Sequence, residues 1–598
     1  MYYPPIKTIS QSRLLTENFY GYNHNLRCDD GFFFDEKNVS SDLFPIMSVR
    51  KKRGKVMQLT DAKGIFAKDA GAYIDGTSLY YDGQLITNLL ADLGERQMVS
   101  MGAYLCIFPD AYYLNTKNLN DHGYMGTTYT TVDTITYTPC NIEGAAITYN
   151  YTQSTQPQNP SNGEYWLDTS SSTHVLKQYS ETTGMWVEIA TVYIKITSPN
   201  IGQSIKEFDG IKISGCNYEG VSDVLSEQIN ALNNTSIIWA RGNDYIVVIG
   251  ILDQVVTQEN TMVTVSRDIP TMDYVCESNN RLWGCFYGIK DGEAVNEIYA
   301  CKLGDFKNWN CYMGISTDSY TVSLGSDGVF TGAVNHLGKP LFFKENCIHK
   351  IYGNAPSNYQ LQTTECRGVQ QGSYKSLIVV NETLFYKSRS DVVAYEGSLP
   401  TGVSEVFGDI LYKDASAGAV GGKYYISMKD EDDTPFMFCY DTNKGIWHKE
   451  DNEDVVQFTT LKDELYYINS DNELKCIKGT DGEPESYLDD DENDIGVPWM
   501  LETGMIGVEY PDQKYLSRFV LRMNLAENAT FKLYVMYDSD GVWELKADEK
   551  GDGILKSFLL PITVPRCDHL KIKMEGNGEC KIFSLAKYLE VGSEITHD

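Results

Sequence analysis

Residues that could perform catalysis are present in this chain, but they do not stand at the spacings that such chemistry needs. The eight histidines are scattered, and no two of them have the spacing of metal ligands or of an HExxH motif. The sequence has no GxSxG turn for a nucleophilic serine, no P-loop and no GxGxxG after a strand. Carboxylates are so frequent that a nearby pair does not indicate a glycosidase, which needs two that face each other about 5 to 10 Å apart. We therefore predict no enzymatic activity, no bound metal and no cofactor.

One group of aromatic residues has the composition of a ligand-binding surface. Trp166, Tyr179 and Trp186 fall within a compact hairpin pattern at residues 163–189. Flat aromatic faces pack on sugar rings, so these three side chains could form a platform for a glycan. The alternative is that they form the small core of a module with little else to bury, and we favour this alternative.

The fourteen cysteines do not have the pattern of a metal site. The closest group is Cys276, Cys285, Cys301 and Cys311, and it lacks the paired CxxC of a zinc site. Most cysteines lie in apolar strand patterns. We predict buried free thiols in a reducing compartment, since free cysteine packs as a small hydrophobic residue.

The charge balance of the chain is strongly acidic. Lysine and arginine total 50 and aspartate and glutamate total 82, which gives a net charge of −32. Tight nucleic-acid binding needs clustered basic residues that displace phosphate counterions, and no basic stripe exists here. One basic cluster, Arg50, Lys51, Lys52 and Arg53, is interpreted as a solvated turn or a contact between subunits.

The sequence has neither the pattern of a signal peptide nor that of a membrane span. The N-terminal segment Met1-Tyr2-Tyr3-Pro4-Pro5 lacks a charged region followed by an apolar one, so we expect no signal peptide. No run of 18 apolar residues exists, so we expect no membrane span.

A short phrase, a turn residue followed by Leu or Tyr and aromatic residues, recurs along the chain. Four copies are anchored at Leu341, Leu384, Tyr424 and Leu465, in steps of 43, 40 and 41 residues. An earlier copy stands at Gly76–Tyr81. A repeat near 40 residues made of strands and turns indicates the blades of a β-propeller. The predicted fold class is all-β, with a β-propeller, an inserted small β-rich domain and a C-terminal β-sandwich.

The domain boundaries follow from where this repeat starts, breaks and ends. The first residues have no helical period, and such an arm could add a strand to the last blade or dock on a neighbour. The last hundred residues alternate with period two, which is typical of a sandwich. Short helices are predicted around residues 86–95 and 222–233. The predicted segments are an extended arm (1–54), the first blade or blades (55–118), one or two inserted β-rich modules (119–268), the remaining blades (269–479), an acidic solvated linker (480–495) and the sandwich (496–598).

The amino-acid sequence of the arm resembles that of a known family. The segment Asn38–Gly54, preceded by Asp29-Asp30-Gly31-Phe32, is similar to the opening of bacteriophage tail propeller proteins, the hub, nozzle or stabilisation proteins of short-tailed phages. The stretch from Trp499 to Trp543 is similar to the sandwich that ends some of those chains. This chain departs from the family in having Phe32 where an acidic residue is common, and in its insertion at 119–268.

The resemblance implies a structural protein of the virion tail, assembled in the bacterial cytoplasm. It implies a ring of identical subunits, usually six, that extends the channel of the portal and adaptor, retains the genome and conducts DNA during ejection. Genomic DNA would pass without tight binding, because an acidic lumen repels phosphates. We expect the arm and the inserted module to contact other subunits or neighbouring tail proteins. The arm residues concerned are Phe32, Phe33, Phe34, Arg50, Lys51, Lys52 and Arg53.

Two other functions remain open at this point. One is a receptor- or glycan-binding tail component that uses the hairpin at 163–189 on the host surface. The other is a propeller-type polysaccharide hydrolase, although the sequence lacks the repeated Asp-box of sialidases.

Overall fold

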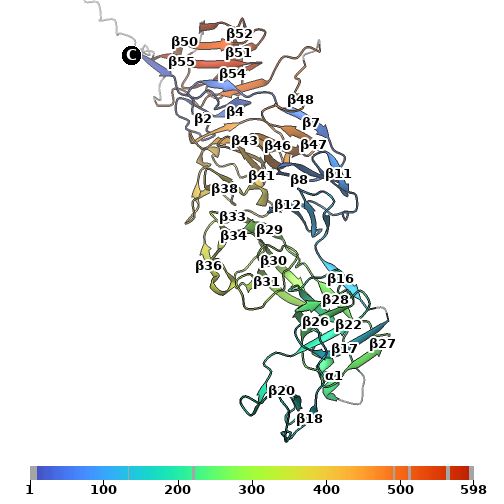
Figure 1. Ribbon diagram of the computed structural model, residues 1–598. Helices are drawn as coiled ribbons and strands as arrows, with labels where there is room; N and C mark the ends of the chain where they lie inside the picture. Colours follow the sequence, from blue (N-terminus) through green and yellow to red (C-terminus); the bar gives the residue numbers. More distant parts are fainter. Residues whose placement is uncertain are drawn as a thin grey trace, which may run out of the picture. The chain divides into compact units, whose positions relative to one another are not determined.

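The computed structural model describes residues 10–131, 133–218, 223–488, 492–509, 513–560 and 566–591. Strands dominate these residues, and the expected all-β class is confirmed (Figure 1). Their one α-helix is α1 (Asp223–Asn230), which confirms the helix expected at 222–233; residue 222 lies outside the described residues. The chain divides into two compact units, residues 1–96, 343–348 and 364–598, and residues 97–342 and 349–363.

The first unit contains four antiparallel sheets with the form of propeller blades. In each, consecutive strands pair in sequence order, as in a meander. These blades are β8 (Ala62–Lys68), β9 (Ala70–Asp75), β10 (Ser78–Tyr81) and β11 (Gln84–Thr87); β37 (Ile378–Val380), β38 (Thr383–Lys387), β39 (Val392–Tyr395) and β40 (Thr401–Gly402); β41 (Lys413–Val420), β42 (Lys423–Lys429), β43 (Pro435–Asp441) and β44 (Ile446–Lys449); and β45 (Val455–Leu461), β46 (Glu464–Asn469) and β47 (Glu473–Cys476).

The last of these blades takes its fourth strand from the start of the chain. Strand β7 (Gly54–Gln58) pairs antiparallel with β47, so that Gly54 lies opposite Cys476. A side chain at Gly54 would not fit, because a Cβ there would lie 2.1 Å from the backbone oxygen of Asp481. A fifth, two-residue strand, β48 (Glu483–Pro484), pairs with the other edge of β7. The blade is thus completed by a segment just after the predicted arm.

The repeated phrase marks equivalent positions in the blades. Leu384, Tyr424 and Leu465 stand in β38, β42 and β46, the second strand of their sheets, and all three are fully buried. The copy at Gly76–Tyr81 differs, because it falls in β10, the third strand of its sheet. The helix predicted around 86–95 is wrong: residues 84–87 form β11 and a loop follows.

The second unit holds three more sheets of the blade type and the inserted module. Its last blade crosses the division, because residues 343–348 group with the first unit. These blades are β12 (Gln97–Met101), β13 (Tyr104–Phe108), β14 (Tyr112–Asn115) and β15 (His122–Tyr124); β29 (Tyr274–Ser278), β30 (Arg281–Lys290), β31 (Glu293–Ala300) and β32 (Tyr320–Ser323); and β33 (Gly332–His336), β34 (Lys339–Lys344), β35 (Cys347–Tyr352) and β36 (Gln360–Glu365).

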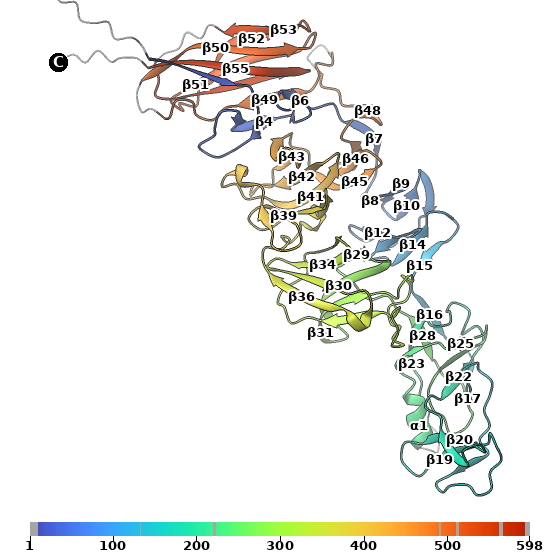
Figure 2. The ribbon, with the colours of Figure 1, turned by 60° about the vertical axis from the view of Figure 1, so that its left-hand side comes forward.

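The inserted module starts later than residue 119, because β15 still belongs to a blade. Two of its sheets and α1 enclose one apolar core that includes Ile135, Ile194 and Ile229. A third, small sheet carries the aromatic hairpin (Figure 2). The sheets are β16 (Thr127–Thr130), β28 (Thr264–Arg267), β23 (Gly210–Ser214) and β24 (Thr235–Ile237); β25 (Ala240–Arg241), β26 (Tyr245–Ile249), β22 (Tyr193–Thr197), β17 (Thr134–Cys140) and β27 (Val256–Glu259); and β18 (Tyr151–Gln153), β19 (Tyr165–Asp168), β20 (Val175–Ser180) and β21 (Met185–Glu188).

The C-terminal sandwich of the first unit includes strands from the start of the chain. One sheet is formed by β5 (Val39–Ser40), β6 (Met47–Val49), β55 (Cys580–Val591), β50 (Lys514–Leu525) and β53 (Leu555–Leu560), with β1 (Ser10–Thr16) also on β55. The other is formed by β4 (Asp35–Lys37), β49 (Pro498–Glu502), β54 (Leu570–Asn577), β51 (Thr530–Tyr537) and β52 (Glu544–Lys550). A further pair, β2 (Gly21–Tyr22) and β3 (Phe32–Phe33), is parallel. The segment predicted as an extended arm therefore supplies edge strands to both sheets.

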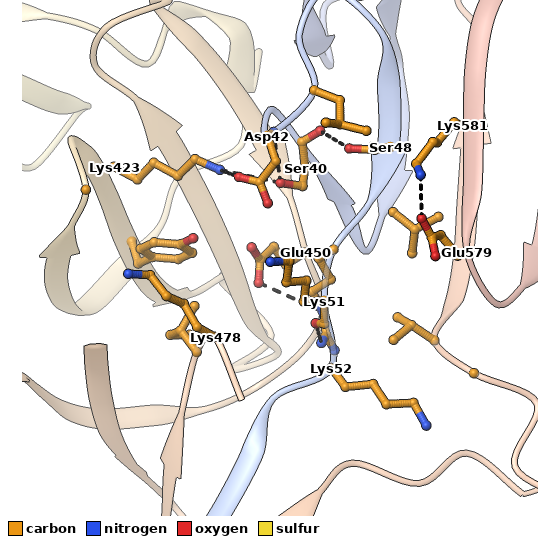
Figure 3. A pocket seen from close by; sticks show the side chains of 18 of the residues that line it. Ser40, Asp42, Ser48, Lys51, Lys52, Lys423, Glu450, Lys478, Glu579 and Lys581 are labelled. Carbon is orange, nitrogen blue, oxygen red and sulfur yellow. Dashed lines mark hydrogen bonds and ion pairs between the residues drawn. The ribbon is translucent and has the colours of Figure 1, made fainter. Parts of the chain in front are cut away.

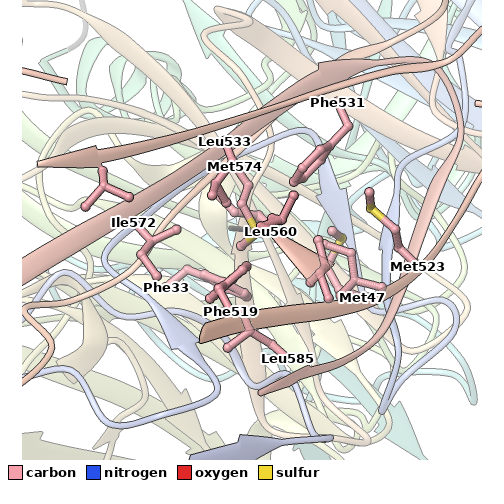
Figure 4. Close-up of a cluster of buried hydrophobic side chains, with 14 of the residues drawn as sticks. Phe33, Met47, Phe519, Met523, Phe531, Leu533, Leu560, Ile572, Met574 and Leu585 are labelled. Atoms are coloured by element: carbon pink, nitrogen blue, oxygen red, sulfur yellow. The ribbon is translucent and has the colours of Figure 1, made fainter. Parts of the chain in front are cut away.

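The core of the sandwich is closely packed and draws on both ends of the chain. Phe519, Phe531 and Met574 are fully buried between the sheets, and Phe33 and Met47 of the arm pack among them (Figure 4). Burying a side chain of this size contributes about 1.5–3 kcal/mol to folding. The arm is thus part of the sandwich core.

We predict that Phe531→Ala lowers the free energy of unfolding by about 3–5 kcal/mol, because it leaves a cavity that the packed sheets cannot fill. Val542→Ala, at a side chain 57% exposed, is the matched control and should change it by about 0.5 kcal/mol or less. Urea unfolding followed by tryptophan fluorescence measures both. Equal effects of the two substitutions would contradict this account of the core.

Candidate functional site

The basic cluster of the arm lies where the sandwich and two blades of the first unit meet. Arg50 donates to Glu485 at 2.9 Å and to Asp451 at 3.1 Å. Arg53 donates to Glu450 at 2.7 Å and contacts Asp451 at 3.0 Å. The side chain of Arg53 is fully buried. The two arginines therefore bind carboxylates of their own chain.

Burial increases the effect of these ion pairs on the pKa values of the carboxyl groups and on the stability of the fold. Burial alone would raise the pKa of the Asp451 carboxyl, but the guanidinium groups of Arg53 and Arg50 outweigh it and hold that pKa below its usual range. The same balance lowers the pKa of Glu485. Removing one partner of a buried pair leaves an uncompensated charge, which costs about 3–5 kcal/mol. Glu485, expected in a solvated linker, is instead half-buried within this network.

The aromatic residues of the arm also contact their own chain. Phe33 packs in the sandwich core, and the Phe32 ring lies 5.3 Å from that of Tyr20. The ammonium of Lys571 lies 4.0 Å from the centre of the Phe34 ring. The expectation that these residues contact another subunit stays a prediction.

A buried pair of titratable groups joins the arm to a blade. The Nδ1 atom of His448, in β44, lies 3.0 Å from a carboxylate oxygen of Glu36, in β4. Burial raises the pKa of Glu36, and the charge of His448 opposes that rise. The other carboxylate oxygen of Glu36 and the Nε2 atom of His448 are buried and have no hydrogen-bond partner among the described residues. Arm and blade thus meet through polar groups as well as apolar ones.

A pocket of about 820 Å³ opens beside this junction. Lysines reach it from the arm, from two blades and from the sandwich (Figure 3). Lys423 lies 2.6 Å from Asp42, and Lys581 lies 2.7 Å from Glu579. Lys52 pairs with Asp494. We call this cavity, which includes Lys51, Lys52, Lys423, Lys478 and Lys581 in its wall, the junction pocket.

The three aromatic residues of the hairpin come together as the sequence predicted. Trp186 lies 5.5 Å from Trp166 and 5.5 Å from Tyr179, measured between ring centres, in edge-to-face contact. Trp166 is buried, its Nε1 donates to the backbone oxygen of Gln153, and Lys177 lies 4.7 Å from its ring centre. This arrangement favours a small aromatic core over an open platform, and glycan contact stays a prediction.

A second groove, of about 570 Å³, was not predicted from the sequence. It lies between the blades β37–β40 and β41–β44, with Phe385 and Tyr440 in its wall, 5.8 Å apart between ring centres. Thr401, Asn443 and Glu396 also line it and supply a hydroxyl, an amide and a carboxylate. Asn and Thr near two turns, 381–383 between β37 and β38 and 442–443 between β43 and β44, were the one signal in the sequence.

Within the described ranges, no group of three or more His, Cys, Asp or Glu side chains is placed to hold a metal ion. No helix in the part of the chain that the structure describes is long and apolar enough to cross a membrane.

Comparisons with known proteins give no family. No protein-family model and no curated protein matches the chain. Among solved structures it is similar to an exo-β-1,3-galactanase from Phanerochaete chrysosporium, with 8% identity, 52% of this chain and 94% of that one covered, and a TM-score of 0.21. It is similar to a family 43 arabinoxylan arabinofuranohydrolase from Bacillus subtilis, with 10% identity, coverage of 54% and 95%, and a TM-score of 0.17. PorZ of Porphyromonas gingivalis has 9% identity, coverage of 86% and 81%, and a TM-score of 0.26.

The prediction that this chain is not an enzyme is wrong as stated. It treated the lack of a catalytic motif as decisive, whereas glycoside hydrolases are among the solved structures similar to the chain. At these TM-scores the likeness carries no argument about a particular activity.

We predict that Arg53→Met lowers the free energy of unfolding by about 3–5 kcal/mol, because Glu450 and Asp451 then stay buried without their main partner. Lys52→Met, which removes a part-exposed ion pair two residues from Arg50, is the matched control and should cost about 1 kcal/mol or less. Urea unfolding at neutral pH measures both. A loss for Arg53→Met no larger than that of the control would show that the network does not support the junction.

Proposed function

We propose that this protein is a structural component of a bacteriophage tail that assembles into a ring around the DNA channel. The observation that carries the proposal concerns Asn38–Gly54, the segment whose amino-acid sequence resembles that of the tail propeller family. That segment holds β5 and β6 of the sandwich, the two buried arginines and the start of β7 in the last blade. The resemblance thus falls on the piece of chain that joins sandwich and blade.

The charge of the chain supports the same proposal. With a net charge of −32 per copy, a ring of several copies would surround its channel with excess negative charge. Such a lumen repels phosphates, so DNA can move through it without binding tightly. Copies of the chain, the portal and adaptor proteins and other tail proteins are the proposed partners, in the virion tail.

Imaging of the purified full-length protein tests the proposal. We expect negative-stain images to show closed rings with a central channel, and rings that dock coaxially when a portal–adaptor complex is added. A monomer at every concentration, with no association with that complex, would contradict the proposal. The same images would give the ring symmetry.

Recognition of a polysaccharide is a second candidate, favoured by the groove between the blades β37–β40 and β41–β44. The aromatic rings, hydroxyl, amide and carboxylate that line it match what a sugar chain offers: apolar ring faces and hydroxyl groups. Galactan and arabinoxylan are the polymers to try first. Glu396 supplies one carboxylate to the groove, whereas a glycosidase needs two that face each other. We therefore propose binding of the polysaccharide, and hydrolysis is measured in the same experiment.

We predict that Asn443→Ala weakens binding of galactan or arabinoxylan oligosaccharides by about fivefold, the effect of one lost hydrogen bond of about 1 kcal/mol. Tyr179→Ala, in the aromatic hairpin of the other unit, should leave that binding unchanged. Titration calorimetry measures affinity, and release of reducing sugar measures hydrolysis with Glu396→Gln as its control. If Tyr179→Ala abolishes binding and Asn443→Ala does not, the sugar site is the hairpin and this assignment fails.

A further inference from the structure

A chain with a net charge of −32 faces an obstacle to self-association, since two copies repel each other over most of their surfaces. Association then requires a local region of opposite charge, which also steers the encounter and fixes the orientation of the partners. The junction pocket is such a region. Its wall includes six basic side chains and three carboxylates.

The basic groups of the pocket are not all neutralised. Lys51 is exposed; its backbone oxygen accepts from Arg50 at 2.9 Å, and its ammonium makes no hydrogen bond or ion pair with a described residue. Lys478 is exposed, and its ammonium donates to the backbone oxygen of Asp463. Because a backbone oxygen carries no net charge, Lys478 keeps its positive charge uncompensated. Lys51 and Lys478 can therefore receive carboxylates that come from outside.

Five aliphatic side chains also line the pocket. Leu43 and Val49 of the arm, Val420 of β41, Ile477 after β47 and Val497 before the sandwich contribute to it. A simple inorganic anion would leave these groups in contact with water. A peptide segment with carboxylates beside the aliphatic parts of its side chains covers them, so the chemistry of the wall favours an acidic peptide.

An acidic segment of this kind is exposed in the same unit. Asp430, Glu431, Asp432 and Asp433 form the turn between β42 and β43, an uninterrupted run of four carboxylates. Asp430 stabilises the turn by accepting from the backbone N–H groups of Asp432 at 3.0 Å and Thr434 at 2.9 Å. Glu431 and Asp432 are exposed, and Asp433 pairs with Lys413 at the surface. The turn thus presents fixed negative charge to solvent.

The two charged features lie at opposite ends of one strand. Lys423, in the pocket wall, begins β42, and the acidic turn follows Lys429 at its end. Seven residues of strand separate them by about 20 Å, at about 3.3 Å per residue. When the acidic turn of one copy binds the basic pocket of the next, the contact is head-to-tail. Such a contact repeats from copy to copy and forms a closed ring when the rotation between copies allows it.

The geometry points to the junction pocket as the site that receives the acidic turn Asp430–Asp433 of a second copy of this chain. This inference rests on the proposed ring, and it names the contact that would hold neighbouring subunits. The carboxylates of Glu431 and Asp432 meet the ammonium groups of Lys51 and Lys478, while the aliphatic wall packs against the rest of the turn.

A charge exchange between the two features tests the contact. The pocket variant carries Lys51→Glu and Lys478→Glu, the turn variant carries Glu431→Lys and Asp432→Lys, and a third variant carries all four. Sedimentation velocity over a range of concentrations gives the self-association of each full-length protein. The control carries Lys290→Glu and Lys550→Glu, which are exposed and lie outside the pocket. Circular dichroism confirms that each variant is folded.

We expect each two-residue variant to weaken self-association by about tenfold or more, because like charges then face each other across the contact. The fourfold variant should recover the wild-type association to within about threefold, and the control should match the wild type. Association of the wild type should also weaken as salt rises, since salt screens exposed charges.

The outcomes separate this inference from the proposed function. If rings form and the pocket variant assembles as the wild type does, the contact is wrong while the proposed function stands. If both two-residue variants fail to assemble and the fourfold variant does not recover, the occupant is not this turn and the inference is overturned. A wild type that never assembles overturns both the ring and the contact.

Discussion

The first unit depends on the burial of two arginines that belong to the start of the chain. Arg50 and Arg53 stand between the sandwich and the last blades, and their carboxylate partners come from the segment after β44 and from the segment before the sandwich. Charges placed in such an environment are tolerated only when every member has its partner. The positions of the arm, the last blade and the segment at Glu485 are therefore interdependent. Strand β7 follows Arg53 directly, so the same residues also set the register of the added strand.

The parts of this architecture that depend on local pattern could be predicted from the sequence, and those that depend on distant partners could not. Leu384, Tyr424 and Leu465 reveal the blades because each fills the same buried position after a tight turn. The phrase at Gly76–Tyr81 has the same local cause, but it lies in a third strand, which no local pattern distinguishes. A short helix was expected around residues 86–95, yet residues 84–87 form β11, because β10 offers them an edge, and a loop follows.

The candidate site was even harder to predict from local sequence patterns. The run Arg50–Arg53 is visible in the sequence, but its partners lie about four hundred residues further along the chain, so a solvated turn was the natural interpretation. The junction pocket draws its wall from six separate segments, and no spacing in the sequence connects them. The aromatic hairpin is the contrary case: Trp166, Tyr179 and Trp186 lie on consecutive strands, and their proximity followed from the hairpin pattern.

The strand β7 has a consequence for how the protein is made. Its partner β47 is more than four hundred residues later in the chain, and β1 must wait for β55 near the other end. At a ribosomal rate of about 5–20 residues per second, β7 is synthesised about 20–80 s before β47. During that interval the N-terminal segment carries unpaired strand edges and apolar side chains such as Phe33 and Met47, which are prone to aggregation. Chaperone binding to the nascent chain, or early partners among neighbouring nascent chains on one messenger RNA, would protect it until the last blade can close.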